Sequence, residues 1–425
     1  MGSNVDDFDI QDMETNLRLL MVGPPGLVAM RRHIDWAVEN GAAVLVADFR
    51  HQEHLMLPSS VRCVDLWPGR AHGIGQATLH KKSERSVYVG TLRLRAIANA
   101  FQPHVIHAYR LDRLTYIALK ARLSPLVVSV WGFMKHWLTA EVTPDDRLWL
   151  RRLRAGAHTL LVENPNLLDA LAKVPLAPLQ VDCFPLGVDS NLFHPGNSDK
   201  AMAWRFALDI PSDATVVLSP RGWSQTYGQQ YIMRAFADAY YRLGRPLVLV
   251  LMGLGRTKQP ERLAREVLDL GVSLGVSHAI RWIPEVPYED MPGVYALADI
   301  VVNYPWYDTF PSTLLEAAAC ARPVITSDLP AYRNTFIERF CRLVEPENPT
   351  ALADALIGTV AGGPISWANS VEQARQAVQA EYEENAQKQR LIALYHRIAA
   401  ERSRRDVRAV SKSVFQTRRP SITLS

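Results

Sequence analysis

The feature that most constrains this chain is a repeated alternation of short apolar runs with longer amphipathic stretches. Short apolar runs bounded by turn residues predict strands that are buried on both faces. The amphipathic stretches between them predict helices, and this order is typical of a parallel sheet with helices on both sides. Because the pattern occurs once in each half of the chain, we expect an α/β protein with two Rossmann-like, doubly wound sheets.

The apolar runs give the expected positions of the strands. In the first half they are 17–22, 43–47, 61–65, 105–108, 126–130 and 159–163, with helices between them such as 30–39 and 114–122. In the second half they are 216–219, 247–252, 280–282, 300–302 and 323–326.

The length of 425 residues also favours two domains, because it exceeds what one hydrophobic core usually holds. Residues 181–195 read VDCFPLGVDSNLFHP, with two prolines, one glycine and no helical period, which is typical of a connection between domains. We therefore expect an N-terminal domain over 17–190 and a C-terminal domain over 191–380.

A helix is predicted over 381–402, because Leu391, Leu394 and Ile398 form one apolar stripe among charged residues. The stripe fits either domain, and we expect the helix to pack back across a cleft between the two. Open parallel sheets bind ligands beyond the carboxyl ends of their strands, so two facing sheets predict a ligand site in that central cleft.

Composition excludes several classes of protein. The four cysteines lie far apart with no CxxC pair, which argues against a zinc site and a disulfide framework. No apolar run approaches the roughly 20 residues that span a bilayer. Residues 1–16 are acidic and polar, unlike a secretory signal, and are expected to be disordered. We therefore expect a cytoplasmic protein.

The net charge of +4 comes largely from the C-terminal end. Residues 403–425 are basic and poor in apolar side chains, which predicts a disordered tail. Phe415 is the only aromatic residue there, whereas an arm that binds single-stranded nucleic acid interleaves several, so nucleic acid is not an expected partner. A basic tail leaves peripheral contact with an anionic membrane open.

The most informative segment is 298–333, which reads as strand, loop, helix and strand. The loop holds Asp308, and Glu316 follows in the helix after seven intervening residues. Pro311 suits the first helical turn, because its φ is fixed and it has no N–H. The amides that follow, Ser312 to Leu314, would then offer unpaired donors and a partial positive charge to a diphosphate.

The two carboxylates of this segment suit a nucleotide sugar. Glu316, one turn deeper, can accept hydrogen bonds from two adjacent hydroxyls, as a ribose presents them, and Asp308 can hold sugar hydroxyls in the same way. Taken singly, a turn-forming Asp308 and a buried, satisfied Glu316 are the plainer interpretations.

The spacing of these residues resembles a known signature. An acidic residue, seven residues and a Glu inside LLEAAACARPVI resembles the retaining glycosyltransferases of family 4, whose GT-B fold joins two Rossmann-like domains. Other segments resemble that family in the same order: PHVIHAYR, PLVVSVWG, AHTLLVENPNLLDAL, FPLGVDSNLFHPG, LSPRGWSQTYGQQYIMRAF and LVLVLMGLG. The resemblance covers nearly everything from residue 17 to residue 400.

The resemblance implies roles for three residues. Glu316 is similar to the glutamate that holds the donor ribose, and Asp308 to the acidic residue, usually Glu, that contacts the transferred sugar. Arg221 is similar to the arginine that contacts the diphosphate. Its guanidinium is always charged and can bind two oxygens at once, which suits a departing diphosphate. The shorter Asp308 leaves the identity of the sugar open.

The clearest departure is at Tyr227. The family usually has a lysine there, and a tyrosine can donate a hydrogen bond to phosphate but brings no positive charge. Arg221 and the helix N-terminus would then carry more of the binding. The other predicted donor contacts are Gly222, Gly253, Phe310, Pro311, Ser312, Thr313 and Leu314.

The N-terminal domain offers weaker candidates. Gly23 and Gly26 belong to a GPPG turn after the first strand, where missing side chains let a donor approach the backbone, or where a plain turn is all that is needed. His107 and Trp131 end two adjacent predicted strands, and with His136 they are predicted acceptor contacts; Trp131 alternatively packs in the core.

No HExxH motif, Cys/His cluster or DxD-type pair stands in a donor-binding context, so we expect no metal and no other cofactor. A Walker P-loop and a complete GxGxxG after a strand are also missing, which argues against ATPase and dinucleotide-dependent functions. The sequence therefore predicts a retaining, metal-independent glycosyltransferase. It would transfer a sugar, most simply a hexose, from a nucleotide diphosphate sugar to an unidentified acceptor. A nucleotide-sugar epimerase or hydrolase on the same fold and a degenerate, non-enzymatic binding protein are the alternatives.

Overall fold

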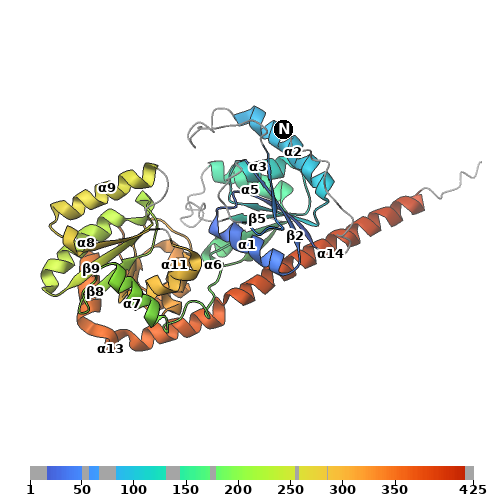
Figure 1. Cartoon of the computed structure of the whole chain (residues 1–425). Coiled ribbons are helices and arrows are strands. Elements are labelled where there is room, and N and C mark those ends of the chain that lie inside the picture. Colours follow the sequence, from blue (N-terminus) through green and yellow to red (C-terminus); the bar gives the residue numbers. More distant parts are fainter. Residues whose placement is uncertain are drawn as a thin grey trace, which may run out of the picture. The chain divides into compact units, whose positions relative to one another are not determined.

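Two parallel sheets organise the computed structural model, which describes residues 17–49, 57–66, 83–130, 144–172, 179–253, 258–284 and 286–416. Each sheet belongs to its own unit (Figure 1). The N-terminal unit comprises Met1–Val162, Leu168–Phe184 and Lys388–Ser425, and the C-terminal unit comprises Glu163–Leu167 and Pro185–Gln387.

The N-terminal sheet has seven strands in the order β3-β2-β1-β4-β5-β6-β7, and all neighbours run parallel. Its strands are β1 (Arg18–Val22), β2 (Ala43–Asp48), β3 (Arg62–Asp65), β4 (Val105–Tyr109), β5 (Leu126–Val130), β6 (Thr159–Val162) and β7 (Gln180–Cys183). Every residue of β4 and β5 is buried, as expected for central strands covered on both faces.

Helices connect these strands and cover the sheet. They are α1 (Val28–Glu39), α2 (Ser83–Phe101), α3 (Arg113–Ala121), α5 (Pro144–Gly156) and α6 (Pro165–Ala172). The side chain of Asp112 caps α3 by accepting from the N–H groups of Leu114 and Thr115, which fixes where that helix begins.

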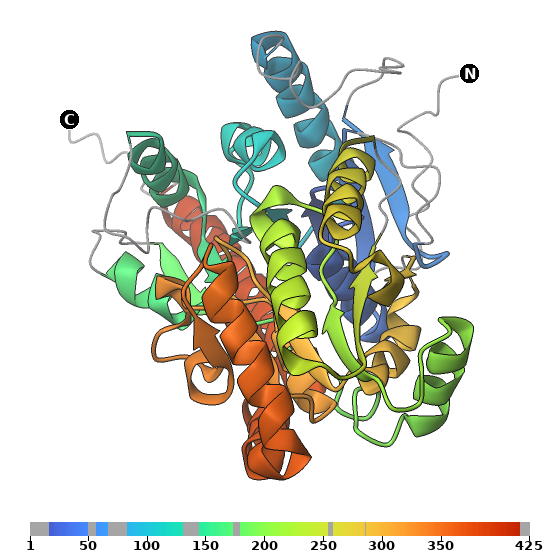
Figure 2. The same ribbon diagram turned by 90° about the vertical axis from the view of Figure 1, so that its left-hand side faces the viewer.

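The C-terminal sheet has six strands in the order β10-β9-β8-β11-β12-β13, again all parallel. The strands are β8 (Thr215–Ser219), β9 (Leu247–Met252), β10 (Ile280–Ile283), β11 (Ile300–Asn303), β12 (Val324–Ser327) and β13 (Arg342–Val344). The helices are α7 (Ser198–Ala207), α8 (Gln229–Leu243), α9 (Lys258–Ser273), α10 (Met291–Leu297), α11 (Ser312–Ala319), α12 (Phe336–Phe340) and α13 (Pro349–Glu381). Helices α8 and α13 pack side by side on this unit (Figure 2).

The expected strands are found within one or two residues, but two strands were not predicted. β7 reads QVDC and β13 reads RLV, and each lies at an edge of its sheet with a single neighbouring strand. Both strands are only partly buried, and they lack the run of apolar residues by which most of the other strands are predicted. The presumed connection over 181–195 therefore begins as β7.

The C-terminal helix α14 (Glu384–Gln416) is longer than expected, because residues 403–416 continue it where a disordered tail was predicted. Adding a residue to an existing helix costs little compared with starting one, and Arg, Ala and Lys are good helix formers. From Lys388 on, α14 belongs to the N-terminal unit. Residues 417–425 and 1–16 lie outside the described residues. Among the helices that the structure describes, none is long and apolar enough to cross a membrane.

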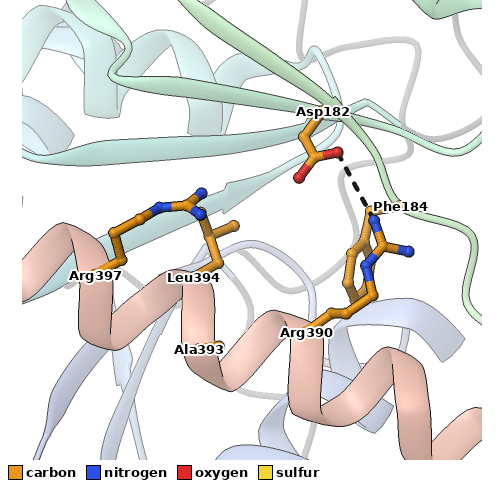
Figure 3. A pocket seen from close by; sticks show the side chains of 6 residues that line it. All are labelled: Asp182, Phe184, Arg390, Ala393, Leu394 and Arg397. Atoms are coloured by element: carbon orange, nitrogen blue, oxygen red, sulfur yellow. Dashed lines mark ion pairs between the residues drawn. The ribbon is translucent and has the colours of Figure 1, made fainter.

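Polar contacts along its length fix α14 to the N-terminal unit. Lys388 Nζ lies 2.6 Å from Glu39 Oε2, and Arg402 Nη1 donates to the carbonyl oxygen of Pro103 at 2.6 Å. Between them, Arg390 donates to the Cys183 carbonyl oxygen at 3.1 Å and lies over the Phe184 ring. The last contact borders a cavity of about 190 Å³, lined by Asp182, Phe184, Arg390, Ala393, Leu394 and Arg397 (Figure 3).

A buried cluster of hydrogen-bonded rings also joins α14 to the sheet. His107 of β4 lies 2.6 Å from the hydroxyl of Tyr395 on α14 and 2.7 Å from the hydroxyl of Ser129 on β5. Tyr109 lies 2.9 Å from His33 of α1. Both histidines are fully buried. Burial lowers the pKa of His107 to about 3, and burial with the neighbouring charges of His107 and Arg32 lowers the pKa of His33 well below its usual value.

We predict that acid destabilises this cluster. The unfolded chain protonates its histidines near pH 6.5, whereas the folded protein keeps His33 and His107 neutral until the pH approaches their lowered pKa values. The unfolded state therefore binds more protons below about pH 6.5, and stability falls with falling pH by up to ~1.4 kcal/mol per pH unit per histidine. Urea unfolding between about pH 7 and about pH 5 measures this slope, which His107→Gln is expected to reduce.

The matched control is His396→Gln, since His396 lies exposed on α14 next to Tyr395. It should leave the slope of the wild-type protein unchanged. Equal slopes for His107→Gln and the wild type would contradict the prediction.

Candidate functional site

The C-terminal sheet reverses its strand order between β8 and β11. From β8 the chain proceeds to β9 and β10 on one side, and from β11 it proceeds to β12 and β13 on the other. The loops after these two strands leave in opposite directions, and doubly wound sheets bind ligands at such a switch point. Arg221 follows β8 and Asp308 follows β11, so the fold brings two of the predicted residues to this position.

The two loops are bound to one another. The backbone N–H of Trp306 donates to the Thr226 carbonyl oxygen at 3.0 Å, and its indole N–H donates to the Gln225 carbonyl oxygen at 3.2 Å. Gly228 has φ +66°, and a Cβ at this position would collide with the carbonyl oxygen of Tyr304. Only glycine allows both this backbone conformation and this close approach.

Arg221 is held from two sides. Its Nη2 lies 3.3 Å from Asp308 Oδ2, and its guanidinium carbon lies 3.9 Å from the centre of the Tyr227 ring. The side chains of Arg221 and Asp308 are only 16% and 13% exposed, so the ion pair is screened little by water. The structure therefore brings Arg221, Tyr227 and Asp308 together, with the ring of Tyr227 on Arg221.

Charge and burial act against each other at this pair. Burial raises the pKa of Asp308 above its ordinary value, while the Arg221 guanidinium opposes the shift. For Arg221, burial alone would lower the pKa, but the charge of Asp308 and a hydrogen bond with Tyr227 raise it above its ordinary value. The guanidinium is thus permanently positive, and protonation of Asp308 is the event that would break the pair.

Glu316 lies on α11, which begins at Ser312. Pro311 is the residue before the helix, not its first residue as predicted, and adopts an extended conformation. The N–H of Leu314 donates to the Pro311 carbonyl oxygen at 3.2 Å, so this amide is not one of the unpaired donors that were expected. Glu316 is 5% exposed, and its Oε2 accepts a hydrogen bond of 2.7 Å from the hydroxyl of Tyr295.

Among the other predicted donor contacts, the two glycines present their backbone, whereas the Phe310 side chain is engaged in packing. Gly222 follows Arg221, and a Cβ on it would meet nothing within 4 Å, so its backbone is open to a ligand. A Cβ on Gly253 would lie 3.2 Å from the Cα of Gly222, which brings the loops after β8 and β9 together. The side chain of Phe310 stacks on Tyr382 at 5.5 Å, so only its backbone remains to contact a donor.

Polar groups without a partner also lie on the two elements that flank the Asp308 loop. The amide of Asn303, the last residue of β11, and the hydroxyl of Thr313 on α11 are buried and have no hydrogen-bond partner in the described part of the chain. Buried polar groups nearly always have one, so a ligand or water is expected here. Asn303 was not predicted, because an asparagine at a strand end is also a common turn residue.

The structure gives less support to the predicted contacts in the N-terminal unit. His107 lies in the middle of β4 rather than at its end, and both ring nitrogens are engaged in the buried cluster, which corrects its assignment as an acceptor contact. A Cβ on Gly23 would lie 3.1 Å from Met30 and Tyr109, so close packing already accounts for this glycine. Gly26 lies in the turn that leads into α1. Trp131 and His136 lie outside the described residues.

Two further residues of the site were missed. Glu163 and Asn164 lie in the C-terminal unit although they follow β6 directly. The hydroxyl of Thr309, next to Asp308, donates to Glu163, and Asn164 donates to the Thr309 carbonyl oxygen at 2.8 Å. The sequence hint was the polar ENPN run directly after a buried strand. Within the described ranges, no three His, Cys, Asp or Glu side chains gather as a metal site requires.

Comparison with known proteins shows similarity to glycosyltransferases in sequence and in fold. Residues 201–377 match the model of the family described as glycosyl transferases group 1. A D-inositol 3-phosphate glycosyltransferase of Saccharomonospora viridis is 30% identical over 227 residues, 52% of each chain. One of Salinispora tropica is 24% identical over 299 residues, 66% of this chain and 58% of that protein. The chain thus spans little more than half the length of these two curated relatives.

Solved structures are similar over nearly the whole chain. Sucrose-phosphate synthase of Thermosynechococcus elongatus has a TM-score of 0.74 at 19% identity, covering 91% of this chain and all of that one. HepE of Anabaena, in complex with UDP and glucose, has a TM-score of 0.70 at 17% identity, covering 89% and 99%. WaaG, a glycosyltransferase involved in lipopolysaccharide biosynthesis, has a TM-score of 0.65 at 14% identity, covering 89% and 99%. The protein therefore has the predicted GT-B fold, and most of its C-terminal unit matches group 1 of the glycosyl transferases.

Proposed function

We propose that this protein is a retaining, metal-independent glycosyltransferase that uses a nucleotide diphosphate sugar. The observation that carries the proposal is the Arg221–Asp308 pair, placed at the switch point of the C-terminal sheet with the N-terminus of α11 following in the same loop. Arg221 supplies a permanent positive charge for the diphosphate, and Asp308 supplies an acceptor for sugar hydroxyls. The match of residues 201–377 to the group 1 family supports this assignment.

The proposed reaction breaks the bond between the anomeric carbon and the diphosphate oxygen. The acceptor hydroxyl oxygen forms the new bond on the same face of the sugar, and its proton passes to the departing diphosphate. Charge accumulates on the diphosphate as the bond breaks, so a fixed guanidinium lowers the barrier by electrostatic stabilisation. In this proposal Arg221 takes the role that a bound cation takes in metal-dependent transferases.

The comparisons suggest the first substrates to try. HepE has been solved with UDP and with UDP-glucose, which makes uridine diphosphate sugars the first donors. The curated relatives are named for D-inositol 3-phosphate, which makes a phosphorylated polyol the first acceptor. A membrane-bound acceptor approached through the basic C-terminal residues is a second option, and it would make activity on vesicles decrease with salt.

We predict that Glu316→Ala removes donor binding. Thermal melting without metal, across nucleoside diphosphates and nucleotide sugars, should show one base that raises the melting temperature of the wild type, since a ligand of the native state stabilises it by mass action. Glu316→Ala should lose that rise, because the proposed ribose contact is gone. Turnover should persist in the presence of EDTA.

Three results would contradict this. No shift with any nucleotide would overturn the donor site and favour a non-enzymatic protein. Release of free sugar, or its epimerisation, without an acceptor product would favour the hydrolase or epimerase. Loss of turnover in EDTA, restored by a divalent cation, would overturn metal independence.

We predict that the ring of Tyr227, rather than its hydroxyl, matters for the site. Tyr227→Phe keeps the stack on Arg221, whereas Tyr227→Ala removes it and should lower kcat/KM for the donor about three- to tenfold, the range of a cation–π contact. Tyr241→Ala, which removes an exposed ring of the same unit, serves as the control. Equal losses in Tyr227→Phe and Tyr227→Ala would instead assign the role to the hydroxyl.

We predict an acidic limb in the pH profile of donor kcat/KM, set by Asp308. The ionised carboxylate is the form that pairs with Arg221 and accepts sugar hydroxyls, and burial raises its pKa above the ordinary value. Activity should therefore fall as the pH falls through a pKa higher than the usual aspartate value of about 3.9. Asp308→Asn should have low activity without this limb, and an unchanged limb in that variant would assign it to another group.

A further inference from the structure

We propose that Glu163 and Asn164 are positioning residues that fix the Asp308 carboxylate against Arg221. The proposal rests on the function proposed above, and it concerns two residues that do not touch the ion pair themselves. They act through Thr309, the residue that follows Asp308.

Thr309 has each of its polar groups engaged. Its N–H donates to Asp308 Oδ1 at 2.9 Å, its hydroxyl donates to Glu163 Oε1, and its carbonyl oxygen accepts from Asn164 Nδ2 at 2.8 Å. The side chain is 3% exposed, so water cannot replace a lost partner without opening the loop. The orientation of Asp308 is therefore fixed, through Thr309, by Glu163 and Asn164, which lie about 145 positions earlier in the chain.

Asn164 joins a second loop to the first. Its Nδ2 also donates to the Ala331 carbonyl oxygen at 2.8 Å, so both of its amide hydrogens are used. Its Oδ1 accepts from the N–H of Asn166, which orients the amide. The second loop carries Tyr332, a fully buried ring whose hydroxyl is electrostatically coupled to Asp308 and Arg221. One fully buried amide thus joins the loop that carries Asp308 to the loop that carries Tyr332.

This arrangement differs from ordinary core packing. A core that needed only to be filled would use apolar residues, because a buried carboxylate is costly unless its hydrogen bonds are made. Here a carboxylate that is 7% exposed and an amide that is fully buried both reach the backbone and hydroxyl of the residue beside Asp308. Rigid support of a side chain that orients the substrate suits transfer chemistry, since small displacements of the substrate lower the rate strongly.

The experiment removes the Thr309 hydroxyl without changing its shape. Thr309→Val should lower kcat at saturating donor about tenfold, because Asp308 loses part of its support. The Kd of the nucleoside diphosphate product should stay within about twofold, because that product lacks the transferred sugar that Asp308 is proposed to hold. Thr309→Ser keeps the hydroxyl and should recover most of the lost kcat. Glu163→Ala should act like Thr309→Val, and the double variant should be no worse than either single one.

The matched control is Thr335→Val. Thr335 is equally buried, at 3% exposed, but its hydroxyl donates to the Tyr332 carbonyl oxygen and accepts from the N–H of Ile337, which caps α12, so it takes no part in the hydrogen bonds of Thr309. This variant should lose stability with little change in kcat. The control separates the effect of losing any buried hydroxyl from the effect of losing the Thr309 hydroxyl.

The outcomes are distinguishable from failure of the proposed function. No transfer by the wild-type protein with any donor would defeat the function, whereas an active wild type with Thr309→Val and Glu163→Ala equally active would defeat the positioning role alone. Thr309→Val could instead lose melting temperature and nucleoside diphosphate affinity in proportion to its loss of kcat, with the same losses in Thr335→Val. That result would assign these residues to general folding and overturn the inference.

Discussion

The ion pair between Arg221 and Asp308 is the interaction on which the candidate site depends. A buried pair of this kind is stable only while both charges keep their partners, since removing one leaves the other uncompensated in a dry environment. The surrounding elements are arranged to maintain it. The Tyr227 ring stacks on the guanidinium, and Thr309 bonds to the carboxylate. In the proposed function, a ligand that brings phosphate to Arg221 and hydroxyls to Asp308 would replace the contacts that these two side chains make with each other.

Tyr227, near the position where the family that the sequence resembles usually has a lysine, has a physical explanation in this setting. A lysine beside Arg221 would place a second positive charge close to the first, and the two would repel one another when no phosphate is bound. The tyrosine instead presents a ring face on which the guanidinium stacks at 3.9 Å. The site has one fewer charge but a more firmly held arginine. In the proposed function this difference changes how the phosphate would be bound, and it does not by itself argue for a lost activity.

The N-terminal unit shows a different use of buried polar groups. His33, His107, Tyr109 and Tyr395 form a hydrogen-bonded network, and Tyr395 comes from a helix nearly 300 residues further along the chain. Such a network specifies the register of α14 on the sheet more sharply than apolar packing does, because only one placement of the helix makes the bonds. It also explains why a histidine in a predicted strand was misread as a ligand contact, since a satisfied core histidine and an exposed one look the same in a sequence.

The sequence by itself determined the two parallel sheets, because a strand buried on both faces must be apolar and a helix that covers it must be amphipathic. It also determined that Arg221, Asp308 and Glu316 lie beyond the carboxyl ends of strands in the second sheet, since parallel strands place these ends together. It did not reveal the edge strands β7 and β13, which lack that apolar constraint. Only the tertiary structure decided that Tyr227 stacks on Arg221, that Tyr295 bonds Glu316, and that Glu163 and Asn164 support Asp308. These contacts join residues that are distant in the chain, and no local pattern of residues records which distant partner a buried polar group will find.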